Sequence, residues 1–172
     1  MIPVNRQIIQ HAWVVKDTEQ TIKKWVDAMG VGPFFINSHV TVEDLRYMGE
    51  PSELDMTVTL AYAGEVQIEL IEVHSKGPSA FADAFPDGGE GFHHVAVFTE
   101  KYDEDLARYE KLGYRVPTTG VFGDMRFCYI DTRPGMNVMV ELLEESAAVR
   151  AHFAPMRAAA EDWDGVDPIR MV

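Results

Sequence analysis

The sequence is poor in cysteine, in long apolar runs and in basic residues, and each shortage excludes a class of protein. Its 172 residues include one cysteine, Cys128, so no internal disulfide can form and a reducing, cytoplasmic setting is expected. No apolar run approaches the roughly 20 residues that a transmembrane helix needs. The 15 Lys and Arg stand against 28 Asp and Glu, a formal net charge of −13, which argues against nucleic acids and anionic membranes as partners.

The N-terminus also lacks the features of a signal peptide. Residues 1–7 contain no long apolar segment and no small-residue cleavage site, so we expect no cleaved leader. Cys128 lies in the alternating, strand-like run 126–130, which favours a small buried residue over a nucleophile. Hydrophobic residues make up 47% of the chain, which is typical of a globular protein with one ordinary core.

What the sequence does contain is an internal repeat. His11 and His94 each open a strand-like apolar run, and each run is followed by an amphipathic helical pattern that a glycine ends. Gly30 lies 19 positions after His11, and Gly113 lies the same 19 positions after His94. Self-similarity of this kind indicates that one fold unit occurs twice.

Each copy ends in a strand-like run with a glutamate at an equivalent position, Glu69 in the first and Glu141 in the second. We therefore predict an α+β fold of two tandem βαβββ modules. They should form an open, cupped mixed β-sheet barrel with flanking helices. Because strand side chains alternate between faces, His94 should share a face with Ala96 while His93 points the other way.

The expected boundaries follow from the repeat. Residues 1–86 form the first module and its connector, 87–145 the second module and 146–172 a C-terminal helical extension, all within one structural domain. The glycine-to-glutamate spacing is longer in the first copy, which predicts an extra loop around 46–56. The extension has no counterpart in the first half, so we expect it to serve as a packing or oligomer surface.

Matching histidines and glutamates predict a shared cation site if the copies pack about a pseudo-twofold axis. The four residues are His11, Glu69, His94 and Glu141. Imidazole and carboxylate ligands suit one divalent ion such as Zn²⁺, Ni²⁺, Co²⁺, Mn²⁺ or Fe²⁺. An unpaired charge in an apolar strand is costly, which favours ligand roles for Glu69 and Glu141 over a merely structural role.

This pattern resembles the vicinal oxygen chelate superfamily, which includes glyoxalase I, methylmalonyl-CoA epimerase, extradiol dioxygenases and bleomycin or fosfomycin resistance proteins. The matching motifs are QHAWVV at His11, QIELIE at Glu69, HHVAV at His94 and VELLE at Glu141, and the resemblance covers about residues 7–144. It is closest to the glyoxalase and epimerase branch, in which the second of two paired histidines binds the metal.

The resemblance implies a divalent-metal-dependent isomerase or lyase that transfers a proton next to a carbonyl through a metal-stabilised enolate. The substrate would be a small carbonyl compound or an acyl-CoA thioester, and a homodimer is expected. Glu141 is the first candidate for the base. Glu53, with Glu50 nearby, is the alternative that the epimerase branch implies, and Gln67 is a candidate for an additional ligand.

Two other functions fit the same fold. An Fe(II) extradiol dioxygenase normally uses two histidines and one carboxylate, so a fourth ligand at Glu69 counts against it. A metal-free small-molecule binding or resistance protein would not need the ligand set. His93 is expected to make a local hydrogen bond, whereas His39, His74 and His152 have no partner pattern and are expected at the surface.

Overall fold

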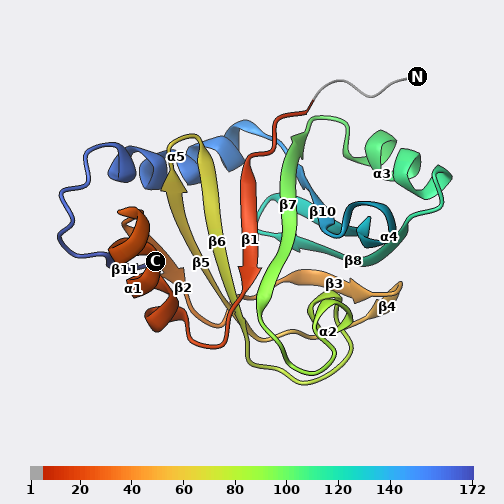
Figure 1. The fold of residues 1–172 in the computed structure, drawn as a ribbon. Helices are drawn as coiled ribbons and strands as arrows, with labels where there is room; N and C mark the ends of the chain where they lie inside the picture. The colour runs from red at the N-terminus through yellow and green to blue at the C-terminus, as the bar shows by residue number, and fades with distance from the viewer. Residues whose placement is uncertain (1–5) are drawn as a thin grey trace.

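A computed structural model describes residues 6–172 and shows a single curved β-sheet flanked by helices (Figure 1). The first half of the chain contains β1 (Gln10–Val14), α1 (Thr18–Met29), β2 (Phe34–Asn37), β3 (Glu43–Tyr47), β4 (Glu50–Pro51), β5 (Met56–Ala63) and β6 (Val66–Val73).

Apart from β3 and β4, the second half repeats this order of strands around one long helix, with two short helices added, and a C-terminal extension follows. It contains α2 (Ala80–Ala84), β7 (Gly91–Thr99), α3 (Tyr102–Lys111), β8 (Arg115–Phe122), β9 (Met125–Asp131), α4 (Arg133–Met136) and β10 (Met139–Glu144), followed by α5 (Ala147–Glu161) and β11 (Ile169–Met171). Within residues 6–172 the sheet has 11 strands, in the order β11-β2-β5-β6-β1-β7-β10-β9-β8-β3-β4.

The two halves meet where β1 and β7 run side by side and antiparallel at the centre of the sheet (Figure 1). On one side β1 pairs with β6 in parallel, and on the other β7 pairs with β10 in parallel. The order of strands is therefore repeated outward from the β1–β7 seam. This confirms the predicted α+β class and its repeated βαβββ arrangement.

The helix that follows β1 ends at the glycine that the sequence pattern predicts, and an aspartate caps its start. The side chain of Asp17 accepts a hydrogen bond of 2.8 Å from the backbone N–H of Gln20, which caps the helix. Gly30 ends it in the left-handed conformation, with φ of 63°. Ile22 on its apolar face is buried against the outer side of the sheet with Leu70.

The insertion predicted as a loop around residues 46–56 is instead a short hairpin formed by β3 and β4. Met48 and Gly49 both have positive φ, and the residues on either side of them, Tyr47 and Glu50, pair across the turn. β3 also pairs with β8, so this hairpin of the first half extends the edge of the second half.

Side-chain alternation gives the sheet two different faces. The inner, concave face carries Ala12, Ile71, Ala96 and Leu143, which belong to one buried core. The register places Gln10, Glu69 and Glu141 on this same face, because each lies two residues from one of these core positions. The polar residues at issue therefore lie inside the cup, at one level of the sheet.

The C-terminal extension covers part of the concave face and adds a strand. Ser146 caps α5 through a hydrogen bond of 3.1 Å from the N–H of Val149. Phe153 and Met156 of α5 line the cavity inside the cup, and β11 pairs in parallel with β2. None of the helices found between residues 6 and 172 is long and apolar enough to cross a membrane. The first five residues, on which the expectation of no leader depends, lie outside the described part.

Candidate metal centre

Three of the four residues predicted as ligands lie together. Glu69 of β6, His94 of β7 and Glu141 of β10 project from three strands onto the concave face. The Oε2 atoms of Glu69 and Glu141 each lie 3.2 Å from Nε2 of His94. The exposed fractions of His94, Glu141 and Glu69 are 0%, 6% and 9%, so the group is buried.

A fourth polar side chain, which the sequence did not single out, completes this cluster. Oε1 of Gln10 on β1 lies 3.2 Å from the same Nε2 of His94. The amide nitrogen of Gln10 donates a 2.5 Å hydrogen bond to Oε1 of Gln67, whose own amide donates to the hydroxyl of Tyr62 at 3.2 Å. Gln67 therefore lies behind Gln10 and holds the amide group of Gln10 with its oxygen toward His94.

The structure corrects the expected placement of His11, which lies on the opposite face of β1. Its ring centroid is 6.2 Å from that of Trp13 and 5.8 Å from that of Phe92, both outside the cup. A slip of one residue along a strand moves every side chain to the other face. The aligned histidines of the two halves therefore do not occupy equivalent positions.

The register shows which residue is the true counterpart of His94. His94 pairs with Met139, two residues before Glu141, and Gln10 pairs with Gln67, two residues before Glu69. Gln10 thus corresponds to His94. The equal spacing from histidine to glycine was misleading, because the segment from β1 to the end of α1 is one residue longer than its counterpart in the second half.

The structure also changes the expected orientation of His93. Ala12 of β1 pairs with His94, but the next residue, Trp13, pairs with Phe92, so His93 is the extra residue of a β-bulge. The bulge interrupts the alternation of faces. His93 therefore lies on the same side as His94, and its ring packs 4.7 Å from that of Phe81.

The local hydrogen bonds of His93 indicate which ring nitrogen of neutral His94 carries the proton and which one keeps its lone pair. Nε2 of His93 lies 3.3 Å from the carbonyl oxygen of Ala80, which can only accept, so this nitrogen carries the proton. Burial lowers the pKa of His93 to about 3, which keeps the ring neutral and leaves its Nδ1 as an acceptor. Nδ1 of His94, 2.9 Å away, must then be the donor. In neutral His94 the lone pair is on Nε2, which faces Glu69 and Glu141.

The electrostatics of the cluster favour a bound cation. When His94 is protonated, the single N–H at its Nε2 cannot serve the three oxygens around it, and Oε2 of Glu69 is buried with no hydrogen-bond partner among residues 6–172. Burial raises the pKa of Glu141 against the opposing effect of His94. Burial alone would lower the pKa of His94, but Glu141 and Glu69 outweigh it and raise it to about 9. An imidazole, two carboxylates and an amide oxygen around one point fit a divalent ion.

A cavity of about 190 Å³ reaches this cluster from the concave side. Gln10, Glu69, Glu141 and Tyr129 form its polar end. The rest of the wall is mainly apolar and includes Val58, Leu60, Phe127, Leu143, Phe153 and Met156. A small molecule with one polar end and an apolar body would find complementary surroundings here.

The second predicted base is placed elsewhere. Glu53 lies in the segment between β4 and β5, is exposed, and is absent from the residues that line the cavity. Glu50, in β4, is exposed as well. β4 is the edge strand of the sheet and is separated from β8 by β3, and Glu53 follows β4 in the chain. Of the proposed bases, only Glu141 contacts the cavity.

Residues 9–129 match the family described as the Glyoxalase/Bleomycin resistance protein/Dioxygenase superfamily. The chain belongs to this superfamily. The match confirms the family that the repeated motifs indicated. Among curated proteins, none matches the chain.

Solved structures of other proteins share the fold at low sequence identity. A hypothetical protein from Bacillus halodurans has 17% identity and a TM-score of 0.58, covering 83% of this chain and 96% of that one. A Streptomyces coelicolor methylmalonyl-CoA epimerase variant in complex with 2-nitronate-propionyl-CoA has 18% identity and a TM-score of 0.52, covering 83% and 99%. Methylmalonyl-CoA epimerase from Mycobacterium tuberculosis has 16% identity and a TM-score of 0.53, covering 87% and 97%.

Proposed function

We propose that this superfamily member is a divalent-metal-dependent isomerase or lyase of the glyoxalase or epimerase type. It would transfer a proton at the carbon next to a carbonyl group, in a small carbonyl compound or an acyl-CoA thioester. The observation that carries the proposal is the convergence of Glu69, His94 and Glu141 with Gln10 at the polar end of an apolar cavity.

The ion would be held by the imidazole of His94, the carboxylates of Glu69 and Glu141, and the amide oxygen of Gln10 in place of the predicted His11. Zn²⁺, Ni²⁺, Co²⁺, Mn²⁺ and Fe²⁺ all suit such a set. When bound, the ion supplies Lewis acidity that makes the carbon–hydrogen bond next to a substrate carbonyl more acidic.

The protein's own residues would bind the substrate and move the proton. Glu141 is the proposed base because it faces the cavity and its burial raises the pKa of its carboxyl, which strengthens it as a proton acceptor. The side chain of Tyr129 interacts with the same carboxylate and favours its charged form. The apolar walls exclude water from the reacting carbon, and the exposed Glu53 has no part in this scheme.

The cavity favours a small reacting group. Its volume of about 190 Å³ lies below the roughly 300–1,000 Å³ of sites that enclose drug-sized ligands. A short 2-oxo compound would fit entirely, whereas only the acyl end of a thioester would enter. The structural likeness to epimerases solved with acyl-CoA compounds keeps the thioester among the proposed substrates.

The donor set disfavours the two alternative functions. An extradiol dioxygenase normally presents two histidines and one carboxylate to Fe²⁺, and this centre presents one histidine and two carboxylates. A metal-free binding protein would have to bury Glu69 and Glu141 beside each other at a considerable cost in desolvation. A homodimer remains a prediction from the family resemblance, and a cytoplasmic setting remains a prediction from the single cysteine.

Metal analysis of untagged protein tests the proposal directly. The ratio of metal to protein should fall by one ion per chain in His94→Ala and in Glu141→Ala, and stay unchanged in the control Glu53→Ala. The wild-type protein should also exchange deuterium at the carbon next to the carbonyl for at least one member of a panel of 2-oxo compounds and thioesters. Unchanged metal content in both variants would contradict the proposal.

A further inference from the structure

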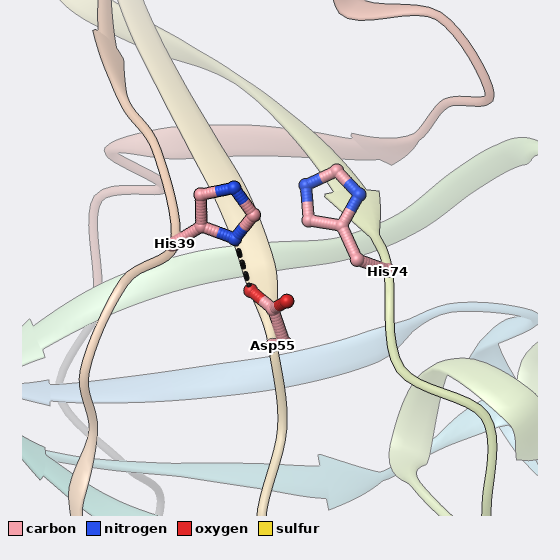
Figure 2. Close-up of side chains that lie close together, drawn as sticks. All are labelled: His39, Asp55 and His74. Carbon is pink, nitrogen blue, oxygen red and sulfur yellow. Dashed lines mark hydrogen bonds and ion pairs between the residues drawn. The ribbon is translucent and has the colours of Figure 1, made fainter.

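A second group of histidine and carboxylate side chains lies at the surface, at one end of β5 and β6 (Figure 2). His39 comes from the connection between β2 and β3, Asp55 immediately precedes β5, and His74 immediately follows β6. Each offers one ligand atom, and these atoms lie within 4.8 Å of one another. We refer to these three residues as the surface cluster.

Backbone hydrogen bonds hold the three segments of the surface cluster together. The N–H of Val40, next to His39, donates to the carbonyl of Met56 at 2.9 Å, and the N–H of His74 donates to the carbonyl of Asp55 at 2.8 Å. The N–H of Ser75 donates to the same carbonyl at 3.2 Å. The cluster is therefore attached to the end of the sheet, and its side chains start from fixed positions.

The side chains are also arranged toward one another. His39 has φ of 54°, which few residues other than glycine adopt, and this conformation brings its Nδ1 to 2.7 Å from Oδ1 of Asp55. The rings of His39 and His74 lie 5.1 Å apart, and Nε2 of His74 is 2.8 Å from Oγ1 of Thr57. The side chains of His39, Asp55 and His74 are 70%, 48% and 29% exposed, so an ion from solution can reach them.

We propose that His39, Asp55 and His74 form a second cation site, for Zn²⁺ or a similar divalent transition ion, with water as the remaining ligand. Two imidazoles and one carboxylate are typical ligands for Zn²⁺, whereas Mg²⁺ and Ca²⁺ prefer oxygen donors alone. This site shares no residue with the buried centre of Glu69, His94 and Glu141. It would tie together three segments, two of which continue directly into Val40 and Met56 of the cavity wall.

The experiment is a Zn²⁺ titration of the untagged protein in which NMR follows the ring signals of the individual histidines. His39 and His74 should respond together to Zn²⁺, and Mg²⁺ at the same concentrations should leave both signals unchanged. His74→Ala should weaken the response of His39 by at least about tenfold in Zn²⁺ concentration, because loss of even an outer partner of a metal ligand costs that much. Asp55→Asn, which keeps the shape and removes the charge, should weaken it as well.

His152→Ala is the matched control, because it removes an exposed histidine outside the surface cluster. It should leave the affinity at His39 and His74 within about twofold of the wild type, well short of the tenfold expected for a ligand. Absence of any joint response in the wild-type protein would overturn the proposal, and so would an unchanged His39 response after His74→Ala. His94 reports the buried centre in the same spectra, so the two proposals can fail separately.

Discussion

The two halves of the sheet place different donors at equivalent positions of the same backbone. In the first half, β1 and β6 supply the amide of Gln10 and the carboxylate of Glu69. In the second half, β7 and β10 supply the imidazole of His94 and the carboxylate of Glu141. A duplicated fold therefore does not require duplicated chemistry, and the donors have to be assigned one residue at a time.

The neighbours of the two glutamates differ in the same way. Leu60 of β5 pairs with Glu69, whereas Tyr129 of β9 pairs with Glu141. Within the described part of the chain, Oε2 of Glu69 is left without a hydrogen-bond partner, while Glu141 has the side chain of Tyr129 beside it. In the proposed mechanism the first half would therefore only hold the cation, and the second half would also transfer the proton.

The largest effect on the rate of proton exchange is expected when each of the two glutamates is replaced by glutamine. Glu141→Gln should lower the rate of proton exchange by about 10²–10⁴-fold even when excess metal is supplied, because a general base contributes that much. Glu69→Gln should lower metal affinity, and excess metal should restore most of the rate. Measuring the exchange rate against metal concentration in both variants separates the two roles.

This comparison has a clear opposite outcome. If excess metal restored Glu141→Gln but not Glu69→Gln, the base would belong to the first half. Circular dichroism of both variants provides the control for folding, since glutamine has nearly the same shape as glutamate. A loss of proton exchange in Glu141→Gln can therefore be distinguished from a loss of folding.

A smaller effect is expected at the bulge in β7, a feature that the corresponding strand β1 does not share. His93→Phe keeps a ring against Phe81 but removes the acceptor for the N–H of His94. Loss of such an outer partner should weaken metal binding about 10–100-fold. His93→Gln, which retains an acceptor, should recover part of the affinity.

The absorption of bound Co²⁺ distinguishes orientation of His94 from loss of folding. A merely structural role of His93 would leave the Co²⁺ spectrum unchanged at saturation, whereas a misoriented His94 should change its intensity. Equal metal affinity in wild type and His93→Phe would show that the hydrogen bond between the paired histidines does not position the ligand.

The sequence allowed the repeated units and both glutamates to be located, because hydrophobic periodicity and the order of elements along the chain can be read from short stretches of sequence. It did not allow the first-half donor to be assigned, since His11 and Gln10 are adjacent and one residue decides the face. The bulge at His93 was equally hidden, because it is defined only by pairing with β1. His39 and His74 lie far apart in sequence, and only the pairing of β5 with both β2 and β6 shows that they are neighbours.

Replacing Gln10 tests whether the first half can supply the same kind of metal ligand as the second half. Gln10→Ala should reduce metal affinity by about tenfold, the lower part of the range for a neutral partner of a metal site. Gln10→His should retain or raise the affinity, since it places an imidazole on both sides of the seam. Calorimetric titration with Zn²⁺ measures both, and a loss in Gln10→Ala below about twofold would remove Gln10 from the centre.

The smallest effect is expected at His11, whose position decides between the two possible alignments of the halves. His11→Ala removes a ring that contacts Trp13 and Phe92 outside the cup, on the face opposite to Glu69 and His94. Metal content and the rate of proton exchange should therefore remain within about twofold of the wild type, far from the 10–100-fold losses expected at true partners of the ion. The same preparations of His11→Ala and Gln10→Ala should be compared side by side. If the losses were reversed, with His11→Ala depleted of metal and Gln10→Ala fully loaded, the register between β1 and β6 would have to be shifted by one residue.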